Sequence, residues 1–315
     1  MTQTANGANR CISVIVPVYF NEGSLAALFA ALTDVEQALA QHGLAMQLVF
    51  VDDGSGDGSM VELLKIKTLR PATTIIKLTR NFGSVPAIRT GLRHVNGDAF
   101  AFLAADLQDP PDLIVAMADR WIAGSKFVIA ERETRRDPLL SRLISKLYYW
   151  LLRKFVLPGY PAGGFDLALM DRAMLVPLRD SAKSAFLPLL AYWLGYQPAV
   201  LRYERRPRLH GRSRWTLRKK FRAFLDVMLG FSVTPIRAIS AVGVIVSLAS
   251  FAYGAAVVIA ALVGNVPVPG FSTLAALVTF LLGLIILMLG VIGEYLWRVF
   301  DENNRRPEAV VDEIY

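Results

Sequence analysis

The stretch Ala101-Phe-Leu-Ala-Ala-Asp106-Leu-Gln108-Asp109-Pro-Pro-Asp112 decides the fold of this chain. Its apolar part predicts a buried strand, and the two prolines end that strand and open a helix. Asp106, Gln108 and Asp109 then lie at the carboxyl end of a strand, where open α/β sheets bind ligands. Oxygen atoms two residues apart on a tight turn suit a hard divalent cation, and such a cation suits a substrate diphosphate. A solvated turn in which an aspartate caps the helix is equally consistent with these residues.

The residues on both sides of this stretch predict strands that alternate with helices. Apolar runs predict strands at 12–18, 47–51, 74–78, 99–104 and 127–130. Helical spacing of apolar residues predicts helices over 25–39, 60–69 and 85–95, the first with Ser24 as its N-cap. This alternation predicts an α/β fold with a largely parallel sheet and helices on both faces. Polar turns follow the first, second and fourth strands, and such turns converge on one edge, where a nucleotide would lie.

A long uncharged segment near the end of the chain predicts a membrane hairpin. The chain is 54% hydrophobic, and residues 238–293 contain no charged residue and no histidine. Because about 20 apolar residues cross a bilayer as a helix, this length fits two spans, at about 237–263 and 271–297. Asn265-Val-Pro-Val-Pro-Gly270 interrupts the run and supplies the turn. Two buried helices of a soluble core are the less favoured alternative, because soluble helices of this length usually carry a polar face.

Basic residues are concentrated just before the hairpin. The net charge is +8, and residues 205–222 hold nine arginines and lysines: Arg205, Arg206, Arg208, Arg212, Arg214, Arg218, Lys219, Lys220 and Arg222. Such a cluster could bind nucleic acid, but beside two spans an anionic membrane surface or a lipid phosphate is favoured. Residues 216–230 are amphipathic, which favours a helix in the membrane interface over an ordinary surface helix.

Six motifs, in this order and spacing, resemble the family-two GT-A glycosyltransferases. The resemblance is to their polyprenyl-phosphate branch, which includes dolichyl-phosphate mannose synthases and bactoprenyl glucosyltransferases. The motifs are Val14-Ile-Val-Pro17-Val-Tyr19-Phe-Asn21-Glu22, Val51-Asp52-Asp53-Gly-Ser55, Leu78-Thr-Arg80-Asn81-Phe82-Gly83, Ala105-Asp106-Leu-Gln108-Asp-Pro, Gly164-Phe-Asp166 and Arg205-x-x-Arg208-x-x-Gly211-x-Ser213. Together with the hairpin they cover nearly the whole chain.

The resemblance implies roles in binding a nucleotide-sugar donor, a UDP- or GDP-sugar. The residues that would line the nucleotide pocket are Pro17, Tyr19, Asn21 and Glu22. Asp52 and Asp53 would accept hydrogen bonds from the base or ribose, although aspartates in such turns also cap the backbone. Asn81 and Gly83 would close the pocket.

The resemblance also implies a divalent cation, Mg²⁺ or Mn²⁺, held by Asp106 and Gln108, with Asp106 beside the donor diphosphate. Relatives commonly carry Asp-x-Asp at this point, whereas Ala104 stands at the first position here. The site therefore lacks one carboxylate of the usual pattern.

The implied acceptor is a polyprenyl phosphate. Its phosphate oxygen is anionic at neutral pH and needs no strong general base. The enzyme needs arginines that hold this phosphate in line with the leaving diphosphate, and a cation that neutralises charge on the leaving group. The acceptor-side candidates are Arg132, Arg142, Arg205 and Arg208, with Asp166 near them.

The predicted organisation is a disordered tail at 1–10, a GT-A catalytic domain at 11–213 and an amphipathic juxtamembrane helix at 214–234. A transmembrane hairpin at 235–300 and a cytoplasmic tail at 301–315 follow. Arg237, Arg298, Arg305 and Arg306 flank an uncharged loop, so both termini and the catalytic domain are expected on the cytoplasmic side of a multi-pass inner-membrane protein.

The predicted function is inverting transfer of one sugar from the nucleotide donor to the polyprenyl phosphate. A glycan-extending membrane synthase is an alternative, although its usual Gln-x-x-Arg-Trp signature is missing. A non-catalytic membrane scaffold on a degenerate transferase fold is another, supported by Ala104. We expect no nucleic-acid partner, and glycines in the spans leave a homo-oligomer open.

Overall fold

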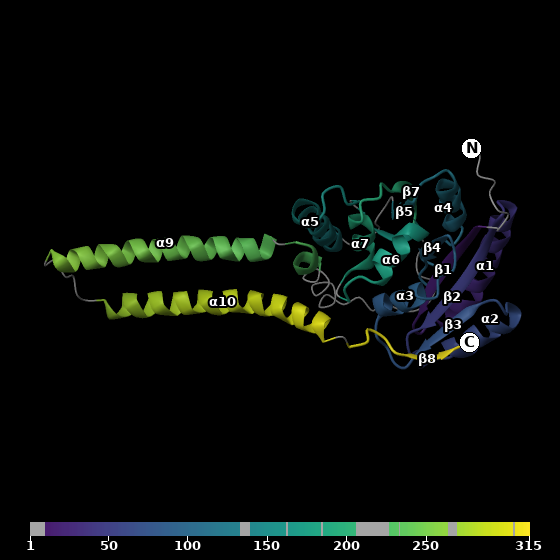
Figure 1. The fold of residues 1–315 in the computed structure, drawn as a ribbon, viewed down its shortest axis with the longest axis horizontal. Helices are drawn as coiled ribbons and strands as arrows, with labels where there is room; N and C mark the ends of the chain where they lie inside the picture. Colours follow the sequence, from purple (N-terminus) through teal and green to yellow (C-terminus); the bar gives the residue numbers. More distant parts are fainter. Residues whose placement is uncertain are drawn as a thin grey trace. The chain divides into compact units, whose positions relative to one another are not determined.

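The structure is a computed structural model that describes residues 10–132, 139–161, 163–183, 185–205, 227–232, 234–263, 270–304 and 306–315. The chain divides into two compact units. One consists of residues 1–224 and 307–315, and the other of residues 225–306. The first unit contains a sheet with helices around it, and the second contains two long helices (Figure 1).

The described part of the first unit contains one eight-stranded sheet in the order β7-β5-β6-β4-β1-β2-β3-β8. The strands are β1 (Arg10–Val18), β2 (Leu44–Asp52), β3 (Thr74–Leu78), β4 (Ala99–Phe102), β5 (Phe127–Arg132), β6 (Phe165–Asp171), β7 (Ala199–Tyr203) and β8 (Val311–Ile314). β1 pairs in parallel with both β2 and β4, and β2 with β3. β6 and β8 run antiparallel to their neighbours. The largely parallel α/β sheet predicted from the sequence is therefore confirmed.

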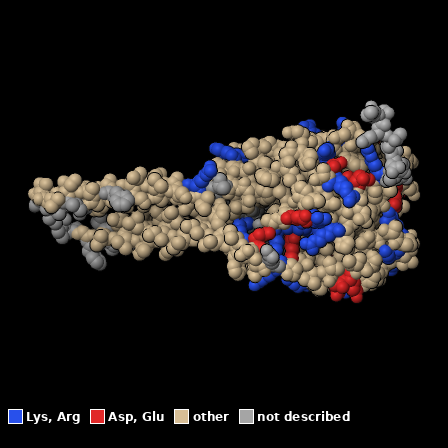
Figure 2. All heavy atoms as spheres, in the orientation of Figure 1, with Lys and Arg blue, Asp and Glu red and all other residues tan. Residues whose placement is uncertain are grey.

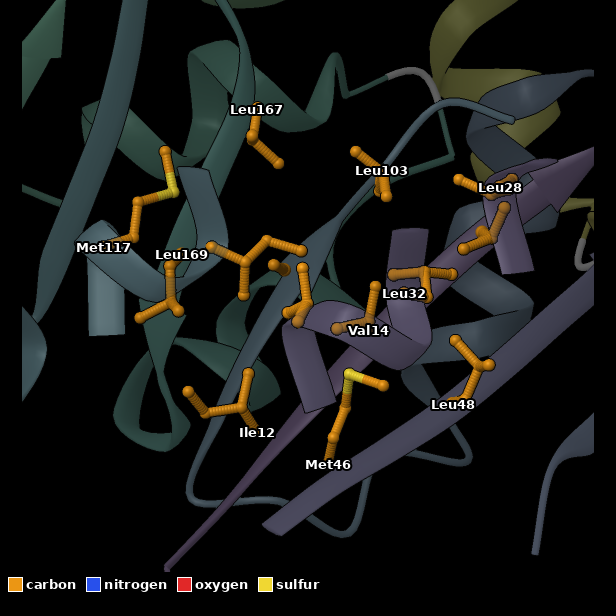
Figure 3. Packing of buried hydrophobic residues seen from close by; sticks show 14 of the residues in the cluster. Ile12, Val14, Leu28, Leu32, Met46, Leu48, Leu103, Met117, Leu167 and Leu169 are labelled. Atoms are coloured by element: carbon orange, nitrogen blue, oxygen red, sulfur yellow. The ribbon is translucent and has the colours of Figure 1, made fainter. Parts of the chain in front are cut away.

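Alternate residues of the central strand face different helices, as the two-residue period of a strand requires. Ile12, Val14 and Val16 of β1 are fully buried in one core cluster with residues of three helices. These helices are α1 (Glu22–Gln41), α2 (Ser59–Leu69) and α4 (Leu113–Ile122). Figure 3 shows Val14 beside Leu32 of α1, and Ile12 among side chains of neighbouring strands.

The opposite face of the sheet receives α3 (Ser84–Leu92). A Cβ added at Gly91 would lie 2.5 Å from Cγ2 of Ile15, so α3 approaches β1 more closely than a side chain at position 91 would allow. This close contact holds the last turn of α3 against Ile15 of β1 and Val51 of β2. The described part of the unit also contains α5 (Leu139–Phe155), α6 (Leu175–Arg179) and α7 (Leu187–Trp193), with a 3₁₀ turn at Arg172–Met174.

The second unit contains α9 (Thr234–Leu262) and α10 (Phe271–Asn303). Their segments Ile236–Ala256 and Phe280–Asn303 are long and apolar enough to cross a membrane, judged by length and composition. On the face drawn in Figure 2, these helices carry few charges, whereas Lys, Arg, Asp and Glu are frequent on the sheet unit. A Cβ at Gly243 would lie 2.9 Å from Cε of Met288, so this small residue packs α9 against α10 of the same chain.

The structure differs from the sequence-based predictions at several points. α1 begins at Glu22 with Asn21 as its N-cap residue, so Ser24 is not the cap but lies buried in the first turn. Residues 311–314, expected within a tail, form β8, and residues 307–315 belong to the sheet unit. β6 and β7 were also not predicted. The turn at 265–269, most of the juxtamembrane helix at 214–234 and the tail at 1–9 lie outside the described residues.

Candidate active site

The turn after β1 is tied to the loop after β2 by backbone amides. The amide of Phe20 donates to Oγ of Ser55 at 3.1 Å, and that of Asn21 donates to Oγ of Ser59 at 2.9 Å. Pro17 is half-buried near the end of β1, paired with Val51 of β2. These bonds bring the predicted donor residues of β1 and β2 together at the carboxyl edge of the sheet. Tyr19 lies in the same turn, where its amide donates to Oδ1 of Asn21 at 2.9 Å.

Glu22 reaches back to the same loop. Its Oε2 accepts a hydrogen bond from the amide of Gly58 at 3.0 Å, and its own amide donates to Oδ2 of Asp57 at 3.3 Å. A Cβ at Gly58 would lie 2.6 Å from the Glu22 carboxyl group, so glycine is needed for this approach. Glu22 therefore shapes the wall of the predicted nucleotide pocket by holding its loop.

Asp53 organises the loop that follows β3. Its two carboxylate oxygens accept hydrogen bonds from the amides of Phe82 at 2.7 Å and Gly83 at 2.9 Å, and from Nδ2 of Asn81 at 2.9 Å. Gly83 has a φ of 110°, which favours glycine. Of the described residues predicted to bind the donor, Asn81 and Gly83 thus both donate hydrogen bonds to Asp53.

Asp52, by contrast, keeps a buried oxygen available. The side chain is 1% exposed, and Oδ2 accepts the Ser55 amide at 3.3 Å. Oδ1 is buried and accepts no hydrogen bond from the described residues. Burial raises the pKa of this carboxyl group, while hydrogen bonds from Ser55 act in the opposite direction. A buried acceptor without a partner is costly, so this atom is a candidate to accept a hydrogen bond from a ligand.

The turn after β4 has an unusual backbone. Phe20 and Leu107 are the only non-glycine residues with a positive φ in the described ranges, at 56° and 57°. Each such residue costs roughly 1–2 kcal/mol and persists where the surroundings enforce it, which is often at a functional site. Leu107 is 8% exposed in the core cluster, so packing holds this turn.

The side chains next to Leu107 are the predicted metal ligands. Oδ1 of Asp106 accepts the amide of Gln108 at 3.2 Å, and both side chains are half-exposed. Oγ of Ser24 donates to the carbonyl of Ala105 at 2.7 Å, which links this turn to the start of α1. No group of three or more His, Cys, Asp or Glu side chains suited to a metal occurs among the described residues. One carboxylate and one amide nevertheless fit Mg²⁺, which proteins commonly hold by one or two carboxylates together with substrate phosphates.

The acceptor-side candidates meet in a charged cluster. Arg132 at the end of β5 forms an ion pair with Asp166 at the start of β6. Nη2 of Arg205 lies 3.4 Å from Oδ2 of the same aspartate, and its Nε lies 3.4 Å from Oδ1 of Asp109. Nε of Arg132 and Nε of Arg205 are buried and donate no hydrogen bond within the described ranges. The cluster therefore holds two guanidinium groups, each with a buried Nε that donates to no described residue, and Arg205 links it to Asp109 in the turn that carries Asp106.

Two members of this cluster have roles that the sequence analysis did not assign. Asp109 is 2% exposed, and its Oδ1 accepts a hydrogen bond from the Tyr203 hydroxyl. Burial, together with the charge of Asp109, raises the pKa of Tyr203 to about 12, so the phenol stays protonated and donates. Asp109 directly follows Gln108, but its partners, Tyr203 at the end of β7 and Arg205 two residues later, are revealed only by the structure. These contacts connect the Asp106 turn to the arginines.

A glycine lies at the entrance to β6. Gly164 has a φ of 65°, and a Cβ there would lie against the ring and hydroxyl of Tyr149 on α5. This packing explains the glycine of the Gly-Phe-Asp motif without a chemical role. The side chain of Arg142 and all of Arg208 lie outside the described residues.

Comparisons with known proteins agree with this architecture. The sequence model of "Glycosyl transferase family 2" matches residues 13–175. An uncharacterised glycosyltransferase of Synechocystis is 31% identical over 306 residues, covering 96% of this chain and 95% of that protein. A bactoprenol glucosyl transferase of Shigella phage SfV is 30% identical over 302 residues, covering 95% of this chain and 97% of its own.

Among solved structures, glucosyl-3-phosphoglycerate synthase from Mycobacterium tuberculosis is similar over 70% of this chain and 79% of its own, with 18% identity and a TM-score of 0.49. A likeness at this level carries no information about ligands. The family match and the near full-length relatives establish that this chain belongs to glycosyl transferase family 2, with a GT-A-type sheet domain, and is a glycosyltransferase.

Proposed function

We propose that this protein transfers a single sugar from a nucleotide donor to a polyprenyl phosphate, with inversion at the anomeric carbon. The observation that carries the proposal is the convergence of Arg132 and Arg205 on Asp166, next to the Asp106 turn. A bactoprenol glucosyl transferase related over nearly the whole chain and two apolar helices that could cross a membrane support a lipid acceptor.

The donor binds at the carboxyl ends of β1, β2 and β3. Oδ1 of Asp52 accepts a hydrogen bond from the base or ribose, and the buried site strengthens that bond. Asp53 contributes indirectly, because its oxygens hold Asn81, Phe82 and Gly83 in the loop beside the pocket. The sugar diphosphate then extends toward Asp106, which lies on the neighbouring strand turn.

The acceptor phosphate binds to Arg132 and Arg205, with Arg142 and Arg208 as further predicted contacts. Guanidinium groups bind phosphate through paired, charge-assisted hydrogen bonds. Asp166 is bonded to both arginines and is half-exposed, so it orients their guanidinium groups toward the incoming phosphate. Asp109 and Tyr203 hold Arg205 from the buried side.

The reaction needs no general base. An oxygen of the lipid phosphate attacks the anomeric carbon, the new carbon–oxygen bond forms, and the bond to the nucleoside diphosphate breaks with its electron pair. Holding the two reactants in line accounts for much of the rate enhancement, because it removes the entropy cost of bringing them together. Asp106 and Gln108 would hold the Mg²⁺ or Mn²⁺ that neutralises charge on the leaving diphosphate.

The protein is proposed to work at the cytoplasmic face of the inner membrane. Arg237 precedes α9's apolar core and Arg298 lies near the end of α10, whereas residues 238–293 carry no charge. Positive residues stay on the cytoplasmic side. α5 provides a second surface suited to lipid, since Leu147 and Trp150 are 56% and 47% exposed and Nζ of Lys154 lies 4.9 Å from the Trp150 ring.

The proposal is tested by incubating the purified full-length protein in detergent with a polyprenyl phosphate and a panel of UDP- and GDP-sugars. Mass spectrometry of the lipid fraction should reveal one hexose added with one donor of the panel. Donor hydrolysis at the same rate with and without the lipid phosphate, and no glycolipid with any donor, would contradict it.

A further inference from the structure

The last residues of the chain form the outer strand of the sheet. β8 pairs antiparallel with β3, and the amide of Thr79 donates to the carbonyl of Val310 at 3.0 Å. The side chains of β8 are all exposed. The backbone ladder therefore holds this strand without burial of an apolar face, and such a strand is weakly held on its own.

A buried ion pair anchors the residues just before β8. Nη1 of Arg89 lies 3.1 Å from Oε2 of Glu308, and the two side chains are 2% and 12% exposed. The same guanidinium donates to the carbonyls of Ser181, Ala182 and Ala185. Glu308 is the one carboxylate paired with Arg89 among the described residues. Removing one member of a buried pair leaves an uncompensated charge, so Arg89 depends on Glu308.

These two contacts bracket one loop of the donor site. Thr79, where the loop begins, is bonded to Val310, and α3, where the loop ends, is bonded through Arg89 to Glu308. Between them, the amides of Phe82 and Gly83 hold Asp53. The same loop touches the turn after β2, because a Cβ at Gly54 would lie 2.5 Å from the carbonyl carbon of Arg80.

We infer that the segment 308–310, which follows α10 in the chain, is a positioning element for the nucleotide pocket. Glu308 acts through Arg89 and α3, and Val310 acts through Thr79, so that both ends of the loop 79–83 stay in place. The donor site is thus held in place by residues that follow the second apolar helix, α10, in the sequence. This inference rests on the proposed donor role of the β2 and β3 loops.

The test compares Glu308→Gln with Asp312→Asn in the full-length protein. Glu308→Gln keeps the shape of the side chain and removes the charge that balances Arg89. Asp312→Asn removes a charge from the neighbouring strand β8, and its partner is the half-exposed Lys77, outside the loop. Hydrogen exchange of the loop amides and binding of UDP and GDP by calorimetry are measured for both, together with the acceptor KM.

In Glu308→Gln, amide exchange at 79–83 should accelerate and the nucleotide Kd should rise, each by about twofold to thirtyfold. The acceptor KM and exchange in β5 should not change, and Asp312→Asn should resemble the wild type. Unchanged exchange and Kd, or faster exchange spread evenly over the sheet, would overturn the inference. A wild-type protein that binds nucleotide without making glycolipid would instead contradict the proposed acceptor and leave this comparison intact.

Discussion

At the scale of single residues, Arg205 connects two carboxylates that are far apart in the chain. It contacts the buried Asp109 and the exposed Asp166, and the latter also pairs with Arg132. A planar guanidinium can hold both carboxylates and still present donors to a phosphate, whereas an ammonium group is a single point of charge. In the proposed acceptor site, the planar shape of the Arg205 guanidinium group, and not its charge alone, is expected to bind the phosphate.

Replacing Arg205 by lysine should therefore raise the acceptor KM by about tenfold to a hundredfold, the range expected for a lost hydrogen bond to a charged group. The donor KM should stay within the error of the wild type. Arg202→Lys is a matched control, because Arg202 is an exposed residue of β7, three positions before Arg205. Steady-state kinetics with each substrate varied separately would check this, and an equal loss of donor binding would refute the acceptor role.

The buried Asp52 carboxylate predicts a trade-off between stability and binding. Its folded-state pKa is raised above that of the unfolded chain, mainly by burial. Its contribution to stability is therefore present at pH values below the unfolded pKa and is lost as pH rises through the folded pKa. At neutral pH, Asp52→Asn should raise Tm, by about 2–4 °C for each kcal/mol recovered, while nucleotide affinity falls.

Differential scanning calorimetry and nucleotide titrations of the wild type and Asp52→Asn, each across acidic to neutral pH, would measure both effects. The two Tm curves should converge on acidification, because the wild-type carboxyl group becomes protonated. A neutral-pH Tm that falls, with unchanged nucleotide affinity, would show that Asp52 only stabilises its turn.

At the scale of secondary-structure elements, the sequence predicted the strands that have a local apolar pattern and missed the strand that depends on long-range pairing. β3 was predicted with its observed bounds, and β1, β2 and β4 were recognised because central strands are continuous apolar runs. β8 was missed, since it has four exposed residues and a partner strand that lies more than 230 positions earlier. No local signal marks such a strand.

The same distinction holds for the site. Asp106 was identified because it lies in the turn after a predicted strand, at the ligand edge of the sheet, whereas the donor roles of Asp52 and Asp53 came from the family resemblance. The pairing of Asp109 with Tyr203 depends on the order β7-β5-β6-β4, which periodicity does not encode. The different environments of Asp52, with a buried oxygen that no described residue pairs with, and Asp53, which binds the loop after β3, likewise become visible only from the hydrogen bonds of the folded loops.

The loop after β2 gives a prediction with an internal control. Gly43 and Gly54 have nearly equal φ values of 70° and 67°, but a Cβ would meet nothing within 4 Å at Gly43 and backbone atoms of Arg80 at Gly54. Gly43→Ala should lower the free energy of unfolding by about 1–2 kcal/mol, the cost of a left-handed backbone at a non-glycine residue, and should leave donor binding unchanged. Gly54→Ala should lower the free energy of unfolding further and should weaken nucleotide binding, because the loops after β2 and β3 must separate. Equal unfolding free energies for the two variants would contradict this account of the loop contact.

At the scale of the whole molecule, the chain leaves the sheet unit, forms two apolar helices and returns to complete the sheet with β8. In the proposed topology, two membrane crossings return the chain to the side on which it started. The charges that flank the apolar helices support the proposal that this side is cytoplasmic.

This topology can be tested with single cysteines on a Cys11→Ser background, since Cys11 is the one natural cysteine. Gly270→Cys, just before α10, should react with an impermeant thiol reagent added to intact cells. Glu302→Cys, near the end of α10, should react only after the cells are permeabilised. The opposite labelling pattern would reverse the proposed orientation.

The most direct measurement of the central claim is lipid-product formation with a polyprenyl phosphate compared with the matching polyprenol, for the wild type and Asp106→Asn. The wild type should add one hexose to the polyprenyl phosphate and none to the polyprenol, because the phosphate oxygen is the proposed nucleophile and the arginines are proposed to bind that phosphate. Asp106→Asn should lower turnover by about two to three orders of magnitude with the Tm unchanged. Transfer to the alcohol as readily as to the phosphate, or near-normal transfer by Asp106→Asn, would contradict the account.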